Sequence, residues 1–316
     1  MQMESNDAIS QKIWDGAIPV SFCVFPSEIP HEIPAPPPPF LVSFFYHYML
    51  VPRVTYFPLV LEKVILQFRT YLQSKFPLSH THSPSDFTDD SSSAQSTEES
   101  LFAKKDLTYW LVYDGVPLKW QVGLVNFSRH YPVGLLFDLY GSPDKLPWEI
   151  TVRFGVSYRL LSDYPTNTLL APPVSRSAVE AIFLATLKEA DQLKHRGREG
   201  PGPIFNELLP EDQHRLWNGL LQHRFDLFWS INKRFMQGAP APDDIEDGQT
   251  TRVFGEDAAA LMVTTGAMKA FRHCPFHFIF LVHGVEVPPE TPAQWMCEWM
   301  AYPDNFIHVV ACKRKK

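Results

Sequence analysis

The sequence has little cysteine, and none of it lies in a pattern typical of a metal site or a disulfide framework. Four cysteines occur in 316 residues: Cys23, Cys274, Cys297 and Cys312. They form no Cys-x-x-Cys pair and have no histidine at zinc-ligand spacing, so we predict no metal site. Because so few, widely separated cysteines do not form a disulfide framework in a chain of this length, we expect a reducing, cytoplasmic location.

Long apolar runs and an excess of positive charge are also missing. No stretch reaches the ~18 apolar residues of a membrane span, and the opening MQMESNDAIS lacks the apolar core of a signal peptide. The formal net charge of −7 argues against nucleic-acid binding, which needs basic surfaces. The one basic cluster, Lys313–Lys316, is interpreted as a solvated end or as an aid to binding an anionic membrane, at about 1 kcal/mol per charge.

Catalytic motifs are absent as well. The sequence has no nucleophile elbow, P-loop or dinucleotide fingerprint, so we predict neither a cofactor nor enzyme activity of the chain's own. Only one of the 12 histidines, His273, adjoins a cysteine, Cys274. A cysteine hydrolase is an alternative that requires this thiol to be activated by a partner that the fold supplies. Otherwise Cys274 is expected to pack at a helix end.

Two segments are poor in residues that build a core. The proline run Pro34–Pro39 predicts a stiff, extended spacer. Residues 79–100 are rich in serine, threonine and acidic side chains, and they bury too little apolar surface to offset the entropy of ordering. We therefore predict a disordered insertion over about residues 76–104.

Around these segments the apolar patterns predict strand, strand, helix, strand and turn, short helix, strand, which is the order of the ubiquitin-like β-grasp. In that fold a mixed sheet wraps one long helix. The predicted elements are a strand at Ala17–Phe25, buried sheet at Phe40–Val51, a strand running into a turn at Val51–Val60, a helix at Leu61–Leu72, a strand and turn at Thr108–Trp120, a short helix or turn at Tyr131–Tyr140 and a strand at Leu146–Phe154.

A weaker copy of this pattern returns near the end of the chain. The segment Phe276–Val287 (FHFIFLVHGVEV) repeats the strand and turn of TYWLVYDGVPL, and a helix is predicted at Thr291–Tyr302 and a strand at Pro303–Ala311. Residues 239–273 show poor strand alternation, and an incomplete second module is one interpretation of this. Two β-grasp modules are the simplest interpretation.

A helical block lies between the two modules. A capping box at Ser177–Glu180 predicts the start of one helix, and a second helical stretch runs from Pro210 to about Met236 with an interruption near His223–Asp226. We therefore predict an α+β chain in which two ubiquitin-like β-grasp domains flank a helix-rich domain. The predicted divisions are an N-terminal helix or tail at 1–13, a first ubiquitin-like domain at 14–170, the helix-rich domain at 171–238 and a second ubiquitin-like domain at 239–316.

Lys194 stands on the apolar stripe of the first helix in this block, in its last turn and just before the linker GREGPGP. Four roles fit this position: complementing the helix dipole with an apolar stem, binding an anion, acting as a catalytic amine, or accepting another protein covalently. A ubiquitin-like donor needs a flexible end that finishes in glycine, whereas this sequence finishes HVVACKRKK. We therefore expect a scaffold or an acceptor rather than a donor.

Eight stretches, taken together, resemble the autophagy protein 5 family. In chain order they cover most of the segments predicted to be ordered. They are Trp14–Val20, Leu50–Val60, Tyr113–Trp120, Tyr131–Leu139, Leu146–Phe154, Lys188–His195 (KEADQLKH), Leu216–Met236 and Glu290–Val310. The sequence departs from the family pattern where residues 121–129 intervene between LKW and His130.

The resemblance implies two ubiquitin-like domains around a helical domain, and it carries the family's acceptor onto Lys194 through KEADQLKH. It implies an isopeptide bond there to autophagy protein 12, and binding of the N-terminal helix of autophagy protein 16. The resulting complex is expected to act as a ligase-like, non-catalytic scaffold for the conjugating enzyme that lipidates autophagy protein 8 with phosphatidylethanolamine at the phagophore membrane. The alternative is a β-grasp interaction scaffold that is never conjugated.

Overall fold

The computed structural model describes residues 2–24, 45–75, 108–118, 121–122, 129–155, 175–195, 202–236, 278–288, 291 and 293–313. The predictions for the spacer at Pro34–Pro39, the disordered insertion, Cys274 and residues 239–273 fall outside these ranges. The boundaries predicted for the four domains remain predictions.

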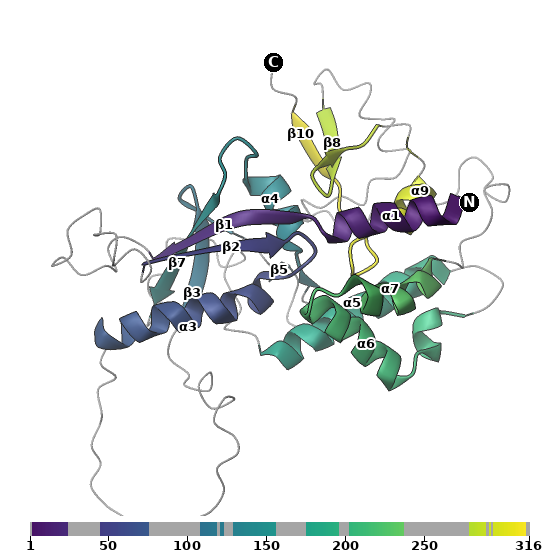
Figure 1. Ribbon diagram of the computed structural model, residues 1–316, viewed down its shortest axis with the longest axis horizontal. Coiled ribbons are helices and arrows are strands. Elements are labelled where there is room, and N and C mark those ends of the chain that lie inside the picture. Colours follow the sequence, from purple (N-terminus) through teal and green to yellow (C-terminus); the bar gives the residue numbers. More distant parts are fainter. Residues whose placement is uncertain are drawn as a thin grey trace, which may run out of the picture.

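The first module is a five-stranded mixed sheet with the strand order β2-β1-β7-β3-β4 (Figure 1). Strand β1 (Ala17–Val24) lies antiparallel to β2 (Tyr46–Pro52) and parallel to β7 (Trp148–Gly155). Strand β3 (Thr108–Tyr113) lies antiparallel to β7 and to β4 (Val116–Pro117). Because side chains alternate across a strand, one face of this sheet is apolar and packs on a long helix. The predicted β-grasp is confirmed.

The long helix, α3 (Phe57–Lys75), begins four residues earlier than the predicted Leu61. The strand and turn predicted at Val51–Val60 are confirmed in part: β2 ends at Pro52 and a turn follows, but Phe57–Val60 belong to the helix. Pro58 fits the first turn of a helix because its missing N–H has no helical partner there. The buried residues of α3 recur at helical spacing on the side that faces the sheet. They are Phe57, Val60, Leu61, Val64, Ile65 and Phe68.

Strand β2 corrects a second expectation, that Phe40–Val51 is buried sheet. Tyr48 and Leu50 are 62% and 69% exposed. They lie at the edge of the sheet on its outer face, whereas Val51 points into the core and is buried. Strand alternation separates the two faces, and an apolar composition alone does not predict which face a given residue occupies.

Two short pieces close the first module. Strands β5 (Gln121–Val122) and β6 (Arg129–His130) form a separate two-stranded ladder in the region where the sequence departs from the family pattern. Helix α4 (Val133–Tyr140) follows, as predicted, and its first five residues are all buried.

The C-terminal module repeats the strand arrangement β7-β3-β4 of the first. Its sheet has the order β10-β8-β9, with β8 (Phe278–Val282) antiparallel to both β10 (Val310–Lys313) and β9 (Val285–Glu286). The two turns match as well, because His283 and Gly284 have φ values of 53° and 78° where Asp114 and Gly115 have 48° and 77°. Two successive residues with positive φ are typical of a two-residue hairpin turn. The duplication predicted from sequence is confirmed for these strands.

The predicted strand at Pro303–Ala311 is wrong over most of its length. A helix, α9 (Ala293–Trp299), precedes it as expected, but β10 begins only at Val310. Residues 302–306 form a turn instead: the Asn305 N–H donates to the carbonyl of Tyr302, and the Asp304 side chain accepts from the N–H of Phe306. Proline, aspartate and asparagine in succession favour such a turn over a strand.

The helical block consists of α5 (Arg176–His195), η5 (Ile204–Glu207), α6 (Pro210–Leu221), α7 (Phe225–Asn232) and η6 (Lys233–Phe235). The interruption predicted near His223 is confirmed. The predicted capping box is shifted, since Ser175 rather than Ser177 caps α5 by accepting a hydrogen bond from the N–H of Ala178.

The N-terminal helix α1 (Gln2–Trp14) bridges the helical block and the C-terminal module (Figure 1). The ring of Trp14 stacks on His223 with centroids 5.3 Å apart, and the indole N–H of Trp229 donates to Asp7. On its other side, the Ser10 hydroxyl donates to the carbonyl of Trp299. A helix from the start of the chain therefore helps to hold the two later units together.

Two buried histidines make the fold sensitive to acid. Desolvation lowers the pKa of His130 to about 4 and that of His283 to about 3, against an ordinary value of 6.5. As the pH falls below 6.5, the unfolded chain takes up protons that the folded chain does not, so the free energy of unfolding falls. Each histidine should account for about 2 kcal/mol of lost stability at pH 5.

Urea denaturation at pH 7.5 and pH 5 measures this loss. The variant His283→Asn, whose side chain tolerates positive φ, should show about half of the wild-type pH dependence. An unfolding free energy that is the same at both pH values would contradict the assignment.

Candidate functional site

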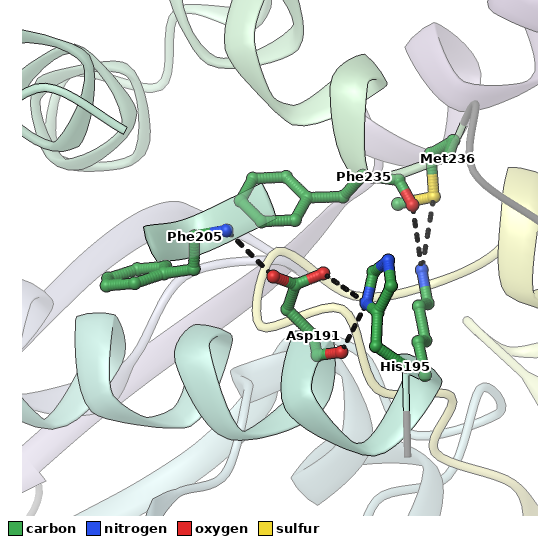
Figure 2. Close-up of polar contacts among 6 residues, drawn as sticks. Asp191, His195, Phe205, Phe235 and Met236 are labelled. Atoms are coloured by element: carbon green, nitrogen blue, oxygen red, sulfur yellow. Dashed lines mark hydrogen bonds and ion pairs between the residues drawn. The ribbon is translucent and has the colours of Figure 1, made fainter. Parts of the chain in front are cut away.

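Lys194 extends the buried stripe of α5 at the end of the helix. Val179, Phe183, Leu187 and Ala190 are buried, and Lys194 follows them half-buried. Its amine donates a hydrogen bond to the carbonyl of Phe235 at 3.2 Å, and it lies 3.8 Å from the sulfur of Met236 (Figure 2). The sequence predicted an accessible amine beside a linker, whereas the structure holds this amine against the end of η6.

The end of η6 suits a lysine. The last carbonyls of a helix carry partial negative charge, which attracts a cation. The apolar stem of Lys194 continues the stripe of α5 while its head reaches polar atoms. The predicted role of a lysine that complements a helix dipole is thus confirmed in part. The helix end that the amine contacts is that of η6, whereas the prediction referred to the end of α5 itself.

Asp191 is the polar residue at this site that sequence reasoning missed. It is 1% exposed, and its carboxylate accepts a hydrogen bond from the N–H of Phe205 at 2.7 Å. The ring Nδ1 of His195 lies 3.3 Å from the other carboxylate oxygen and 2.9 Å from the Asp191 carbonyl (Figure 2). Asp191 therefore ties the last turn of α5 to η5, where the chain returns after the linker.

A signal for Asp191 was present in the sequence. It stands four residues after Leu187 and three before Lys194, which places all three on one face of a helix. An acidic residue on an apolar stripe is buried only when it is paired, so the spacing pointed to a partner outside the helix.

Lys194 also influences a third element, helix α9. Burial raises the pKa of the Cys297 thiol in α9, and the charge of Lys194 lowers it by a smaller amount. The acceptor candidate thus contacts η6 and lies within electrostatic range of α9. The thiols of Cys23 and Cys312 also have raised pKa values, again chiefly through burial. An activated nucleophile needs the opposite shift, so these three cysteines do not support a hydrolase.

A cavity beside α1 is lined by residues from both ends of the chain. It has a volume of about 720 Å³ and opens between α1, the β8–β9 turn and α9. Its walls are mainly apolar, with Lys12 and Glu286 among the lining residues. The apolar contributors include Ile9, Ile13, Val285, Val287, Trp295 and Met300.

The wide apolar face of Leu216–Phe235 is largely buried. The apolar residues of that face form the core of the helical block, together with Trp14 and the stripe of α5. Within the described ranges, no group of three or more histidine, cysteine or acidic residues is placed to hold a metal ion, and no helix is long and apolar enough to cross a membrane.

Comparisons with known proteins agree with this architecture. The family model described as "Autophagy protein ATG5, UblA domain" matches residues 13–85 and 87–154, and the model "Autophagy protein ATG5, alpha-helical bundle region" matches residues 176–238. Autophagy protein 5 of Drosophila melanogaster is 27% identical over 97% of both chains. Autophagy-related protein 5 of Caenorhabditis elegans is 23% identical over 96% of both.

A solved structure has the same fold. The crystal structure of Kluyveromyces marxianus Atg5 superposes with a TM-score of 0.61 at 15% identity, covering 97% of this chain and 100% of the other. At that identity the match supports the fold alone.

Proposed function

The chain belongs to the autophagy protein 5 family and has a role in autophagy, and from that premise we propose that it is the acceptor of a ubiquitin-like protein at Lys194. The donor is autophagy protein 12, joined through an isopeptide bond. With autophagy protein 16, the conjugate serves as a non-catalytic, ligase-like scaffold that promotes the lipidation of autophagy protein 8 with phosphatidylethanolamine. It acts in the cytoplasm and peripherally at the phagophore membrane.

The position of Lys194 carries this proposal. The motif KEADQLKH matches the family at the end of α5, next to the linker GREGPGP. Both ends of that linker are fixed, because Asp191 joins the last turn of α5 to η5. Asp191 therefore helps to hold in place the turn of α5 that carries the Lys194 amine. Ordering the acceptor in advance lowers the entropic cost of reaction.

The chemistry requires only an amine from this chain. In the transfer the neutral Lys194 nitrogen attacks the thioester carbonyl between the donor and its conjugating enzyme. The carbon–sulfur bond breaks to release the enzyme's thiolate, and the nitrogen loses a proton, which the thiolate takes up, as the amide forms. The amine must give up a proton and leave the carbonyl of Phe235 before it attacks. The nucleophilic thiol belongs to the conjugating enzyme, which is consistent with the raised pKa values of Cys23, Cys297 and Cys312.

Reconstitution of lipidation tests the function directly. The purified conjugate, bound to autophagy protein 16, is added to autophagy protein 8, its two enzymes and vesicles containing phosphatidylethanolamine. We expect lipidation to be at least tenfold faster than with the unconjugated chain. Equal rates for the conjugated and unconjugated chains would favour the alternative, an interaction scaffold in which Lys194 only contacts η6.

The cavity beside α1 is the candidate site for the helix of autophagy protein 16. An amphipathic helix places apolar anchors at i, i+3 and i+4, and these need an apolar groove. The cavity offers such walls, and Lys12 and Glu286 can pair with charges beside the anchors. The buried face Leu216–Phe235 offers no comparable surface.

A matched pair of variants tests this groove. Val285 is 56% exposed and lines the cavity, while Val116 is 53% exposed at the equivalent position of the first module's turn. Val285→Asp should weaken binding of the partner's N-terminal helix about tenfold or more, because a charge is placed in an apolar groove. Val116→Asp should leave the dissociation constant, measured by calorimetry, unchanged. Equal affinity for both variants would show that the partner helix binds at another site.

A further inference from the structure

We propose that Met236 is a site of reversible oxidation by hydrogen peroxide, and that its sulfoxide restrains the Lys194 amine and slows conjugation. The consequence for conjugation rests on the proposed function. The modification itself rests on a contact that the acceptor role does not require: the thioether sulfur of Met236 lies 3.8 Å from the Lys194 nitrogen, beside the carbonyl of Phe235 (Figure 2).

Oxidation of the sulfur would convert the weak contact between Lys194 and Met236 into a strong one. A thioether sulfur is a weak hydrogen-bond acceptor, whereas a sulfoxide oxygen is a strongly polar one. An oxygen added to this sulfur stands one bond length from it, within hydrogen-bonding reach of an amine 3.8 Å away. The amine would then donate to two oxygens, that of Phe235 and that of the sulfoxide.

Hydrogen peroxide is the only reactant that this oxidation requires. A sulfur lone pair attacks one oxygen of hydrogen peroxide, the oxygen–oxygen bond breaks, and the leaving hydroxide takes up a proton to become water. The sulfur is oxidised by two electrons and the peroxide is reduced by two. A protonated Lys194 amine beside the sulfur can donate a hydrogen bond to the departing oxygen, which assists the step.

Met236 is at least as exposed as the two described methionines of the C-terminal module. It is 9% exposed, compared with 7% for Met300 and 1% for Met296. Cys297 is the other oxidisable side chain near Lys194, but burial raises the pKa of its thiol, and peroxide reacts with the thiolate. A thioether has no proton to lose, so its oxidation does not depend on ionisation.

The expected effect is a slower transfer. A lysine held by an additional strong acceptor must break one more hydrogen bond before its nitrogen can attack a thioester. Because methionine sulfoxide reductases remove the oxygen, the restraint is reversible. Oxidation would thus lower the supply of conjugate.

The test oxidises the full chain before any enzyme is added. The chain is treated with hydrogen peroxide, the peroxide is removed with catalase, and thiols are restored with dithiothreitol, which leaves sulfoxides intact. The initial rate of adduct formation is then measured for the wild type, for Met236→Leu and for the control Met49→Leu, a half-buried residue of β2 outside both proposed sites. We expect oxidation to slow the wild type and the control about tenfold, and a methionine sulfoxide reductase to restore both. Met236→Leu should not respond.

A second readout separates this proposal from the acceptor function. Acylation by a small N-hydroxysuccinimide ester is followed by mass spectrometry at Lys194 and at the exposed Lys188 of the same helix. Oxidation should lower the rate at Lys194 relative to Lys188 in the wild type but not in Met236→Leu. If the untreated chain forms no adduct, the proposed acceptor function is wrong. The acylation rates of Lys194 and Lys188 still show whether oxidation of Met236 restrains the Lys194 amine. An equal response in Met236→Leu, or a Met236 that stays reduced while exposed methionines oxidise, would overturn it.

Discussion

Replacing Lys194 with arginine is expected to abolish the adduct with autophagy protein 12. Arginine keeps the positive charge and can still donate to the carbonyl of Phe235, so the end of α5 should remain in place. A guanidinium stays protonated at neutral pH and does not attack a thioester. When the chain is expressed with the donor and its two enzymes, the heavier band on a denaturing gel should disappear completely.

Lys188 provides the matched control. It lies on the same helix and is exposed, whereas Lys194 is half-buried. If exposure alone chose the acceptor, Lys188→Arg would remove the adduct and Lys194→Arg would not. We expect the reverse, because the family motif and the fixed end of α5 both select Lys194. An adduct that persists in Lys194→Arg would assign conjugation to another lysine.

Replacing Arg53 with alanine is expected to destabilise the chain by about 3–5 kcal/mol. The Arg53 guanidinium lies 2.5 Å from the Asp138 carboxylate, and the two side chains are only 12% and 4% exposed. Burial raises the pKa of Asp138, and Arg53 together with the N–H of Gly284 opposes that rise. Without Arg53 the carboxyl group stays buried and loses its ion-pair partner.

The cost should be large because Arg53 stands where three parts meet. It follows β2, donates to the carbonyl of Gly134 as well as to Asp138 in α4, and packs against Gly284 of the β8–β9 turn. A side chain added at Gly284 would come within 2.9 Å of the guanidinium. Arg53 therefore joins the first module to the C-terminal one.

Urea denaturation measures the loss, with Arg176→Ala as the control. Arg176 pairs with Glu62, but their side chains are 61% and 31% exposed. Exposed pairs contribute about 0–1 kcal/mol, so this variant should unfold close to the wild-type midpoint. Similar midpoints for Arg53→Ala and Arg176→Ala would show that the buried pair does not hold the two modules together.

The pattern of apolar residues predicted most of the first module because local period and turn residues determine it. The strand at β1, the turn at Asp114–Gly115 and the stripe of α5 are each encoded within a few neighbouring residues. The repeat of strand, turn and strand near the end of the chain was visible for the same reason. The edge position of β2 was not, since it depends on which strands pair.

The site was predicted only in part. The motif around Lys194 identified the residue, but its environment comes from η6 and α9, which are distant in sequence. No local pattern states that the carbonyl of Phe235 meets the lysine of another helix. The cavity beside α1 was missed for the same reason, because α1, β9 and α9 come from the two ends of the chain.

The most direct test of the acceptor role is mass spectrometry of the chain purified from cells that contain the donor and its enzymes. After tryptic digestion, we expect a branched peptide in which the donor's C-terminal glycine is joined to the Lys194 nitrogen. The bond should also prevent cleavage after Lys194. A digest in which Lys194 is always unmodified, while the heavier species is present on the gel, would contradict the account.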